Sequence, residues 1–475
     1  MSELPEGWAK TTLGSLASYI NGKGFKKSEW KTEGLPIIRI QNLNKPSAEF
    51  NYADDSHEDK YKVSNGDLLV AWSASLGAYI WGRGDAWLNQ HIFRVDPFYE
   101  VVNKQFLYYT VKNSIEDLYG KTHGMGMVHV TKGKFEGHEI YLPPLNEQIR
   151  IANKLDSILA KVDKAQARLN KIPTLLKRFR QSVLAAATSG ELTREWRIEN
   201  SSKCSRDIVV GKYEIDNSIV KNRKIPEGWK WVALGNYAKC ARGKFSIRPR
   251  NDPSCFDGDY PFIQIGDLPR EGGVILSHKQ TLNEKGYAVS REFKVGTVVI
   301  AIVGATIANT GIVTYPVCFP DSLVGINSPS DIENVYVDYH LRAEKEEIRQ
   351  ASYAGGGQPN IKLTMINPLP LPLPSVDEIK EIVRRVDSLF SLADVVERKY
   401  NQSKACVDRL TQSLLAKAFR GELVPQDPSD EPAEELLKSI QTERELQTNK
   451  PKASPRKKIN KTKQKIKNMR LLDAP

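Results

Sequence analysis

The chain is poor in cysteine and has no long apolar run. Its five cysteines are scattered along 475 residues, and no two of them form a CxxC pair. This spacing argues against a disulfide framework or a zinc site and favours reduced thiols. No apolar stretch approaches the roughly 20 residues that span a bilayer, and the N-terminal MSELPEGWAK lacks the apolar core of a signal peptide. We therefore expect a cytoplasmic protein without a membrane partner.

The motifs that mark catalysis are also missing. The strings nearest to the [N/D]PP[Y/F] motif of adenine methyltransferases are NPLP (367–370) and DPSCF (252–256), and neither fits. GKT (120–122) ends like a P-loop, but Ile115 stands where the first glycine is needed. The seven histidines form no HExxH pair, and no GxSxG elbow is present. The sequence therefore predicts no catalytic residues, no metal ligands and no cofactor bound by this chain.

The net charge of +12 is concentrated at one end of the chain. Residues 449–475 contain ten Lys or Arg and one Asp, so this segment carries +9 of the total. Its composition predicts a disordered tail. Such a tail could bind DNA phosphates or could be a solvated end, and the sequence leaves both interpretations open.

The chain contains two copies of one unit, each of roughly 200 residues by the usual size of domains. The most similar segments stand at the start of each copy and near its end, where eight of fourteen residues are identical. A duplicated unit predicts two similar halves related by a pseudo-two-fold axis. The matching segments are LPEGWAKTTLG (4–14) with IPEGWKWVALG (225–235), and FRQSVLAAATSGEL (179–192) with LTQSLLAKAFRGEL (410–423).

The first part of each copy mixes short strands with a helix. β-branched apolar runs bounded by Gly, Asn and Asp predict strands, and apolar residues at helical spacing predict one helix in each copy. The fold class is therefore α+β. The predicted strands include PIIRI, DLLVAW and HIFRV in copy one and PFIQI and TVVIAIV in copy two, and the predicted helices are KQFLYYTVKNSIEDLY (104–119) and VDYHLRAEKEEIRQASY (337–353).

A long helix is predicted at the end of each copy. Apolar residues recur there at 4-3-4-3 spacing, the period of a coiled coil. The helices should begin after proline-rich stops and end near Gly190 and Gly421, with a kink at Pro173. Matched registers favour packing of the two helices against each other, and the spacing leaves their orientation open. The predicted seam comprises Ile151, Leu155, Ile158, Val162, Leu169, Ile382, Val386, Leu389, Val396 and Leu410.

Loops rich in Gly, Lys, Arg, Asn and Gln recur at equivalent places in both copies. Arg and Lys pair with guanine edges, Asn and Gln pair with adenine edges, and Gly lets backbone approach a phosphate. One such loop is most often a solvated turn, so the prediction of base contacts rests on the set. The candidates are Lys23, Lys26, Lys27, Arg39, Gln41, Asn42, Lys121, His123 and Lys132 in copy one, and Arg242, Lys244, Arg248, Gln264, Arg270, Gln358, Asn360 and Lys362 in copy two.

Two variable heads followed by similar helices resemble the specificity subunit of type I restriction–modification systems. The helix that opens as LPPLNEQIRIANKLDSILAKVD and closes as LKRFRQSVLAAATSGELT carries the resemblance, together with LPEGW and GELVPQDPSDEPAEELL. The resemblance implies two target-recognition domains, each reading one half of a split, asymmetric site in double-stranded DNA. It also implies two modification (methyltransferase) subunits that use S-adenosylmethionine to methylate adenine. Restriction (translocase/endonuclease) subunits would cleave the DNA with ATP and Mg²⁺.

On this resemblance, the expected architecture is two α+β target-recognition domains joined by two long antiparallel coiled-coil helices. The resulting segments are target-recognition domain 1 (1–142), spacer helix 1 (143–190), a linker (191–224), target-recognition domain 2 (225–373), spacer helix 2 (374–421) and a C-terminal extension with the basic tail (422–475). The chain would be a non-catalytic subunit.

Two alternatives remain open. The chain could be a stand-alone coiled-coil scaffold or a DNA-binding protein without a modification partner. It could also be a methyltransferase or nuclease whose active site carries no recognisable motif. Methylation of DNA by the purified chain without a partner would separate the second alternative from the expected function.

Overall fold

The computed structural model describes residues 4–120, 130–203, 211–216, 218, 223–304, 306–353 and 360–439. These residues form two compact units: unit 1 lies within Met1–Gln166 and Ala405–Pro475, and unit 2 within Ala167–Lys404. The boundaries fall inside both predicted spacer segments, so each unit contains part of each. The basic tail at 449–475 lies outside the described residues.

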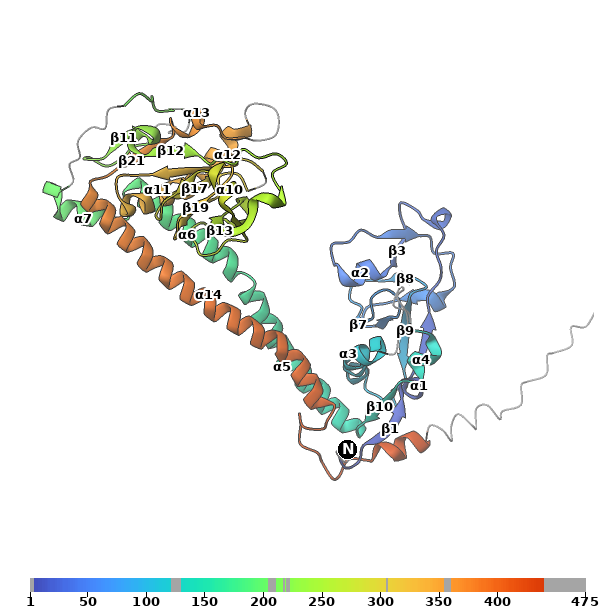
Figure 1. Cartoon of the computed structure of the whole chain (residues 1–475). Helices are drawn as coiled ribbons and strands as arrows, with labels where there is room; N and C mark the ends of the chain where they lie inside the picture. Colours follow the sequence, from blue (N-terminus) through green and yellow to red (C-terminus); the bar gives the residue numbers. More distant parts are fainter. Residues whose placement is uncertain are drawn as a thin grey trace, which may run out of the picture. The chain divides into compact units, whose positions relative to one another are not determined.

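Unit 1 carries an α+β head, called head one below, with three small sheets (Figure 1). The sheet orders are β2-β9-β6-β7, β4-β3-β8-β5 and β1-β10. The strands are β1 (Ala9–Thr12), β2 (Ala17–Asn21), β3 (Leu35–Ile38), β4 (Asn51–Ala53), β5 (Lys62–Val63), β6 (Leu68–Ala71), β7 (Gly77–Ile80), β8 (Ala86–Leu88), β9 (Ile92–Pro97) and β10 (Glu139–Leu142). The helices are α1 (Leu13–Leu16), η1 (Lys27–Glu29), α2 (Ile40–Asn44), η2 (Asp59–Tyr61), α3 (Lys104–Gly120) and α4 (Lys132–Glu136).

Unit 2 carries the second head, called head two. Its sheet orders are β12-β20-β17-β18-β14, β15-β13-β19-β16 and β11-β21. The strands are β11 (Lys230–Ala233), β12 (Lys239–Arg242), β13 (Phe256–Phe262), β14 (Val274–Ile275), β15 (Gln280–Leu282), β16 (Glu292–Phe293), β17 (Val298–Ala301), β18 (Thr310–Val313), β19 (Val317–Cys318), β20 (Leu323–Asn327) and β21 (Pro370–Leu373). The helices are α9 (Leu234–Tyr237), η4 (Pro253–Cys255), η5 (Ile265–Asp267), α10 (Glu284–Ala288), α11 (Asp331–Ala343), α12 (Lys345–Tyr353) and α13 (Leu363–Ile366).

The two heads repeat one pattern of strand neighbours. Ala9 of β1 faces Leu142 of β10, and Lys230 of β11 faces Leu373 of β21. The orders β2-β9-β6-β7 and β4-β3-β8-β5 of head one correspond to β12-β20-β17-β18 and β15-β13-β19-β16 of head two. The α+β class and the internal repeat are therefore confirmed, and the helical prediction at 337–353 corresponds to the end of α11 and to α12.

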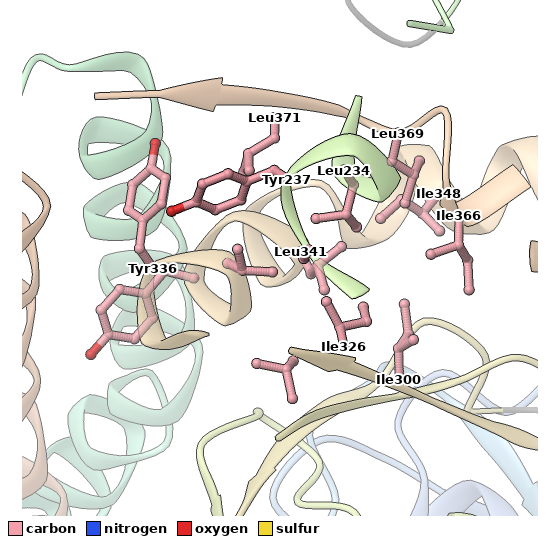
Figure 2. Packing of buried hydrophobic residues seen from close by; sticks show 14 of the residues in the cluster. Leu234, Tyr237, Ile300, Ile326, Tyr336, Leu341, Ile348, Ile366, Leu369 and Leu371 are labelled. Atoms are coloured by element: carbon pink, nitrogen blue, oxygen red, sulfur yellow. The ribbon is translucent and has the colours of Figure 1, made fainter. Parts of the chain in front are cut away.

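Each unit has its own hydrophobic core. In head two, Leu341 of α11 lies between the sheet and β21, with Ile300 and Ile326 on one side and Leu371 on the other (Figure 2). These four side chains are at most 1% exposed. The core extends onto the long helices through Val386 and its neighbours, which fixes head two to the helices of its own unit.

The long helices differ in continuity. The first is broken into α5 (Leu145–Leu169) and α6 (Ile172–Ser189). Pro173 occupies the second position of α6, where a missing N–H is tolerated, so the predicted interruption is confirmed. The second helix, α14 (Val376–Ala418), is continuous over 43 residues, or about 65 Å. α6 ends at Gly190 in the left-handed conformation, as predicted.

In unit 2 the helices are antiparallel. Arg180 of α6 donates a hydrogen bond to Asp394 of α14 at 2.7 Å. Just beyond the end of α6, the carbonyl of Leu192 accepts a bond at 2.8 Å from Arg385, which comes earlier in α14. Increasing residue numbers on one side thus face decreasing numbers on the other, which is the orientation implied by the family resemblance.

The predicted seam residues differ in burial. Ile151, Leu155, Ile382 and Val386 are fully buried and Val162 is 8% exposed, whereas Ile158, Leu169 and Leu389 are half-buried. Val396 and Leu410 are 39% and 38% exposed, contrary to the prediction. At both places the following residue, Glu397 or Thr411, is the less exposed one. Glu397 accepts a bond from Arg180 at 2.7 Å, and an apolar pattern cannot reveal a polar contact of this kind.

The repeated sequence motifs pack on one another at the end of each long helix. Gly190 and Gly421 have φ angles of 81° and 75°. A Cβ on Gly190 would lie 2.3 Å from Pro226, and a Cβ on Gly421 would lie 2.7 Å from Pro5. Both the backbone conformation and the close proline therefore require glycine. The end of a long helix thus meets the Pro-Glu-Gly-Trp motif of the same unit.

A buried glutamate completes each of these junctions, with different partners in the two units. Glu378 accepts a bond from Trp229 at 2.8 Å and pairs with Arg197 at 2.5 Å. Glu147 accepts a bond from Trp8 at 3.1 Å, but its Oε1 atom has no hydrogen-bond partner among the described residues. Burial raises the pKa of Glu147 above its usual value.

We expect Glu147→Gln and Glu378→Gln to have opposite effects on the free energy of unfolding at neutral pH. Glu147→Gln keeps an acceptor for Trp8 and removes a buried charge, so it should stabilise the protein. The folded pKa is raised, so this gain should be complete above it and disappear as the pH falls to the unfolded value of about 4.3. Glu378→Gln breaks the pair with Arg197 and should cost about 1.5–3 kcal/mol.

Thermal unfolding of the two variants between about pH 4 and pH 8 measures both effects. Equal effects of the two substitutions would contradict the difference between the junctions.

Candidate nucleic-acid interface

In head one, two neighbouring parallel strands position two polar loops. β3 and β8 pair in parallel, with Ile38 beside Leu88. Because both strands leave the sheet in the same direction, the residues after them emerge side by side. The backbone of Asn89 donates to the carbonyl of Ile38 at 3.3 Å, which holds the two loops together. Residues 39–41 and 89–91 therefore share one surface.

A glycine turn after β2 packs against the same surface. The backbone N–H of Lys23 donates to Leu88 at 2.8 Å, and the N–H of Gln90 donates to the carbonyl of Lys23 at 3.0 Å. A Cβ on Gly22 would lie 2.1 Å from the carbonyl oxygen of Asn89. The close approach of these backbones thus depends on glycine at position 22.

The three segments border a cleft of about 290 Å³. The Arg39 guanidinium lies 5.8 Å from the centroid of the Trp30 ring and donates to Asn51 at 3.3 Å. Among the described residues, Oε1 of Gln90 and Nδ1 of His91 are buried without a hydrogen-bond partner. Unpaired buried polar atoms are costly, so the cleft favours a polar ligand. The lining residues are Phe25, Trp30, Ile37, Arg39, Ile40, Gln41, Asn89, Gln90 and His91.

The charge of Lys23 is balanced within the protein. Its ammonium group donates to Glu29 at 2.5 Å and lies 3.0 Å from Nδ1 of His57. The hydrogen bond from Lys23 is the main cause that lowers the pKa of Glu29. Lys26 and Lys27, in contrast, are exposed at the start of η1. They are the residues of this turn that can contribute positive charge to the surface.

Head two builds the same scaffold. β13 and β19 pair in parallel, with Phe262 beside Cys318. The N–H of Lys244 donates to Phe319 at 3.0 Å, as that of Lys23 donates to Leu88. A Cβ on Gly243 would lie 2.3 Å from the carbonyl oxygen of Pro320. The glycine turn therefore recurs in head two with these two contacts to the loop after the parallel strand.

The side chains on this shared scaffold differ between the heads. The turn after β3 is closed by a bond from the N–H of Arg39 to Asn42 at 3.1 Å, and the turn after β13 by a bond from Gln264 to Asp267 at 2.8 Å. Matching these turns and loops aligns Arg39 with Gln264, Gln41 with Gly266, Gln90 with Asp321, and His91 with Ser322. At each of these positions, the side chain that lines the cleft in head one is replaced in head two by a side chain of different chemistry.

The structure places many of the predicted contact residues in this loop cluster or next to it. They come from turns far apart in the sequence. Those of head one are Lys23, Lys26, Lys27, Arg39 and Gln41, and those of head two are Arg242, Lys244, Arg248, Gln264 and Arg270; all are exposed except Lys23 and Arg39, which are half-buried.

Asn42 has a structural role instead of the predicted base contact. It is fully buried. Its amide donates to the carbonyls of Ala48 and Glu49 at 3.2 and 3.0 Å, and its oxygen accepts from Arg39. With its amide and its oxygen bonded inside the protein, Asn42 is not available to a base.

Three other predicted residues lie elsewhere. Lys132 is on α4 and donates to the carbonyl of Tyr19 at 2.8 Å. Asn360 forms an isolated bridge with Val303, and Lys362 precedes α13. Lys121, His123 and Gln358 lie outside the described residues.

Sequence reasoning missed the loops after β8 and β19. Asn89 and Gln90 stand directly before the predicted strand HIFRV, and this amide pair at a strand boundary could have been noticed. Asp321 carries no such signal, because it is an ordinary loop carboxylate, and Arg250 ends the basic segment 241–250 from which Arg242, Lys244 and Arg248 were predicted. Their importance follows from the tertiary contacts.

The described part of the chain has neither a metal-binding cluster nor a membrane-spanning helix. Its residues include no group of three His, Cys, Asp or Glu side chains that could bind a metal ion. None of the described helices combines the length and apolarity that crossing a membrane requires.

Two heads with one scaffold and different loop side chains define a protein with paired, non-identical recognition surfaces. The family model described as "Type I restriction modification DNA specificity domain" matches residues 5–174 and 226–404. The EcoBI type I restriction enzyme specificity subunit of Escherichia coli is 32% identical over 471 residues, which cover 92% of this chain and 93% of that protein. The EcoDI specificity subunit of Escherichia coli is 30% identical over 465 residues, which cover 93% of this chain and 96% of that protein. The chain therefore belongs to the specificity subunits of type I restriction–modification systems.

Solved structures support the same fold. A chain from a structure of a type I R-M system matches with a TM-score of 0.62 at 17% identity, covering 89% of this chain and all of that one (100%). The HsdS subunit from Thermoanaerobacter tengcongensis matches with a TM-score of 0.55 at 18% identity, and the match covers 89% of this chain and 98% of that one.

We expect Gly22→Ala to destabilise head one, whereas Gly82→Ala should not. The added methyl group at position 22 would overlap the carbonyl of Asn89, while position 82 has no atom within 4 Å. Overpacking of this kind costs about 1–3 kcal/mol. Thermal unfolding measures the difference between the variants. Equal unfolding temperatures of the two variants would mean that Gly22 does not pack closely against the backbone of Asn89.

Proposed function

We propose that the chain recognises a split, asymmetric site in double-stranded DNA, with one head on each half-site. It would direct adenine methylation and ATP-dependent cleavage by partner subunits. The observation that carries this proposal is the loop cluster that both heads build on one scaffold with different side chains. A shared scaffold suits the regular DNA backbone, and different side chains select different bases.

The cleft of head one has the chemistry for reading base edges. Gln41 and Gln90 carry both a donor and an acceptor, which is the pattern that pairs bidentately with adenine. Arg39 is held by Trp30 and Asn51, so less conformational entropy is lost when it donates to a base.

We assign the chemistry to partner subunits in the cytoplasm. The chain would bind no cofactor and act without catalytic residues of its own, while methyltransferase subunits use S-adenosylmethionine. Restriction (translocase/endonuclease) subunits would use ATP and Mg²⁺. The helix–head junction is present twice, which supports two methyltransferase subunits bound in equivalent ways.

The proposal is tested with the full-length chain, DNA and S-adenosylmethionine, with and without the methyltransferase subunit. Methylated bases are then mapped. We expect methylation at one bipartite sequence with the partner and none without it. Methylation by the chain alone would support an enzyme with its own active site. Absence of sequence-specific DNA protection would support a protein-binding scaffold.

We expect Gln90→Ala to relax recognition at one position of one half-site and to leave the other half-site unchanged. Loss of a bidentate base contact costs about 1–3 kcal/mol of discrimination. Methylation mapping of the assembled complex measures this. Ser18→Ala, an exposed change on β2 outside the cleft lining, is the matched control. Relaxed recognition in both half-sites would contradict independent reading by the heads.

The long helices of unit 2 expose apolar side chains suited to a protein partner. Leu392 and Leu175 are 58% and 59% exposed. Phe179, Val395 and Val396 are also exposed and lie three or four residues from one of these two. Exposed apolar residues that recur along a helix face mark interaction surfaces. We propose that a methyltransferase subunit covers them.

We expect Leu392→Asp and Leu155→Asp to differ in their effects. Leu392→Asp should weaken binding of the methyltransferase subunit about 10-fold or more without lowering the unfolding temperature, since the residue is exposed. Leu155 is fully buried, so Leu155→Asp should cost at least about 3 kcal/mol of stability. Unfolding scans and binding measurements on both variants test this. Normal partner binding by Leu392→Asp would rule out this surface.

A further inference from the structure

Four arginines of head two gather around the loop that follows β19. Arg250 binds the carboxylate of Asp321 at 2.5 Å, and Arg248 approaches it to 3.7 Å. Nε of Arg242 donates to the carbonyl of Asp321 at 2.5 Å, and Arg291 in turn donates to the carbonyl of Arg242 at 2.9 Å. These residues come from β12, the segment after it, and the loops beside β16 and β19.

The cluster carries an excess of positive charge. In the described part of the chain, Asp321 is the one carboxylate that pairs with these arginines. The side chains of Arg248 and Arg250 remain 54% and 50% exposed, and Arg242, Arg291 and Lys244 are exposed as well. Two guanidiniums share this carboxylate and two more bind only backbone carbonyls beside it, so the positive charges repel each other and the arrangement gains stability when a partner supplies further acceptors.

The position of Asp321 connects the cluster with base recognition. Asp321 occupies the place in head two that Gln90 occupies in head one, on the loop that follows the parallel strand. At this place head one therefore presents an amide, and head two presents a carboxylate that orients arginines. The difference falls on the loop that we propose to face the bases.

We propose that head two recognises a guanine through Arg250, held in position by Asp321, or through Arg248, which the carbonyls of Phe245 and Ile247 hold beside it. This inference rests on the proposed function and adds the base class read by one head. A guanidinium fixed by a carboxylate can direct its remaining N–H groups at N7 and O6 of guanine in the major groove. The free acceptor capacity of Asp321 suits the amino group of the paired cytosine. Together they select a G·C pair.

A contact to a phosphate is the competing use of the same cations. The two uses differ in what a substitution changes. Loss of a base contact reduces affinity for one base at one position, whereas loss of a phosphate contact weakens binding to all sequences and makes the salt dependence shallower.

The test uses the full-length chain assembled with its methyltransferase subunit and carrying Arg250→Ala, Arg248→Ala or Asp321→Asn. Binding is measured for duplexes that vary each base of both half-sites, at two salt concentrations. The half-site of head two is the one that Gln90→Ala leaves unchanged. We expect a loss of about 10- to 100-fold, confined to duplexes with guanine at one position of that half-site. Lys294→Ala, which removes an exposed cation of the same head, is the matched control.

A uniform loss with a shallower salt slope would overturn the proposal in favour of phosphate contact. Absence of guanine from this half-site in the wild-type target would overturn it directly. Either result leaves a bipartite methylation target, so it is distinct from failure of the proposed function. Normal base discrimination at the half-site of head one shows that a variant is folded. If Arg250→Ala loses this discrimination, the nearly isosteric Asp321→Asn decides between base contact and phosphate contact.

Discussion

The helix–head junction is the constraint on which the rest of each unit depends. At each junction, a glycine at the end of one long helix packs against a proline. The tryptophan three residues after that proline donates a hydrogen bond to a buried glutamate, which stands at the start of the other long helix of the unit. The glycine cannot be replaced without strain, because a Cβ on Gly190 would overlap Pro226, and the buried tryptophan N–H needs an acceptor at the glutamate position. The junction explains why these motifs are repeated in the sequence while the rest of each copy diverges.

Each head separates its scaffold from the residues that face the ligand. The scaffold consists of backbone contacts, such as the approach of Gly22 to Asn89 and of Gly243 to Pro320. Because these contacts involve main-chain atoms, side chains on the loops can change without moving them. An amide at Gln90 and a carboxylate at Asp321 are therefore compatible with one fold. Such a division allows two recognition specificities on one duplicated unit.

Local patterns were sufficient to predict the helices and the helix ends. The interruption at Pro173 and the left-handed Gly190 follow from the chemistry of single residues. The seam prediction failed at Val396, where the contact between the helices is made by the next residue, Glu397, through its bond to Arg180. Asn42 was chosen for its residue type, yet the structure uses its amide to fix a loop. In both cases a polar contact outside the local pattern decided the role.

The sequence by itself determined the duplication, the α+β class and the long helices, because each of these follows from repetition or periodicity along the chain. The family resemblance rested on specific motifs at the ends of the long helices. The tertiary structure decided which side chains share a site. Gly22, Gln41 and Gln90 meet because β3 and β8 pair in parallel although they lie far apart in the sequence. Arg242, Arg248 and Arg250 meet Asp321 because β12 pairs with β20, with Arg242 opposite Val324, and because the turn after β12 binds the loop after β19. Contacts between distant segments depend on the pairing of whole strands, and no local pattern encodes them.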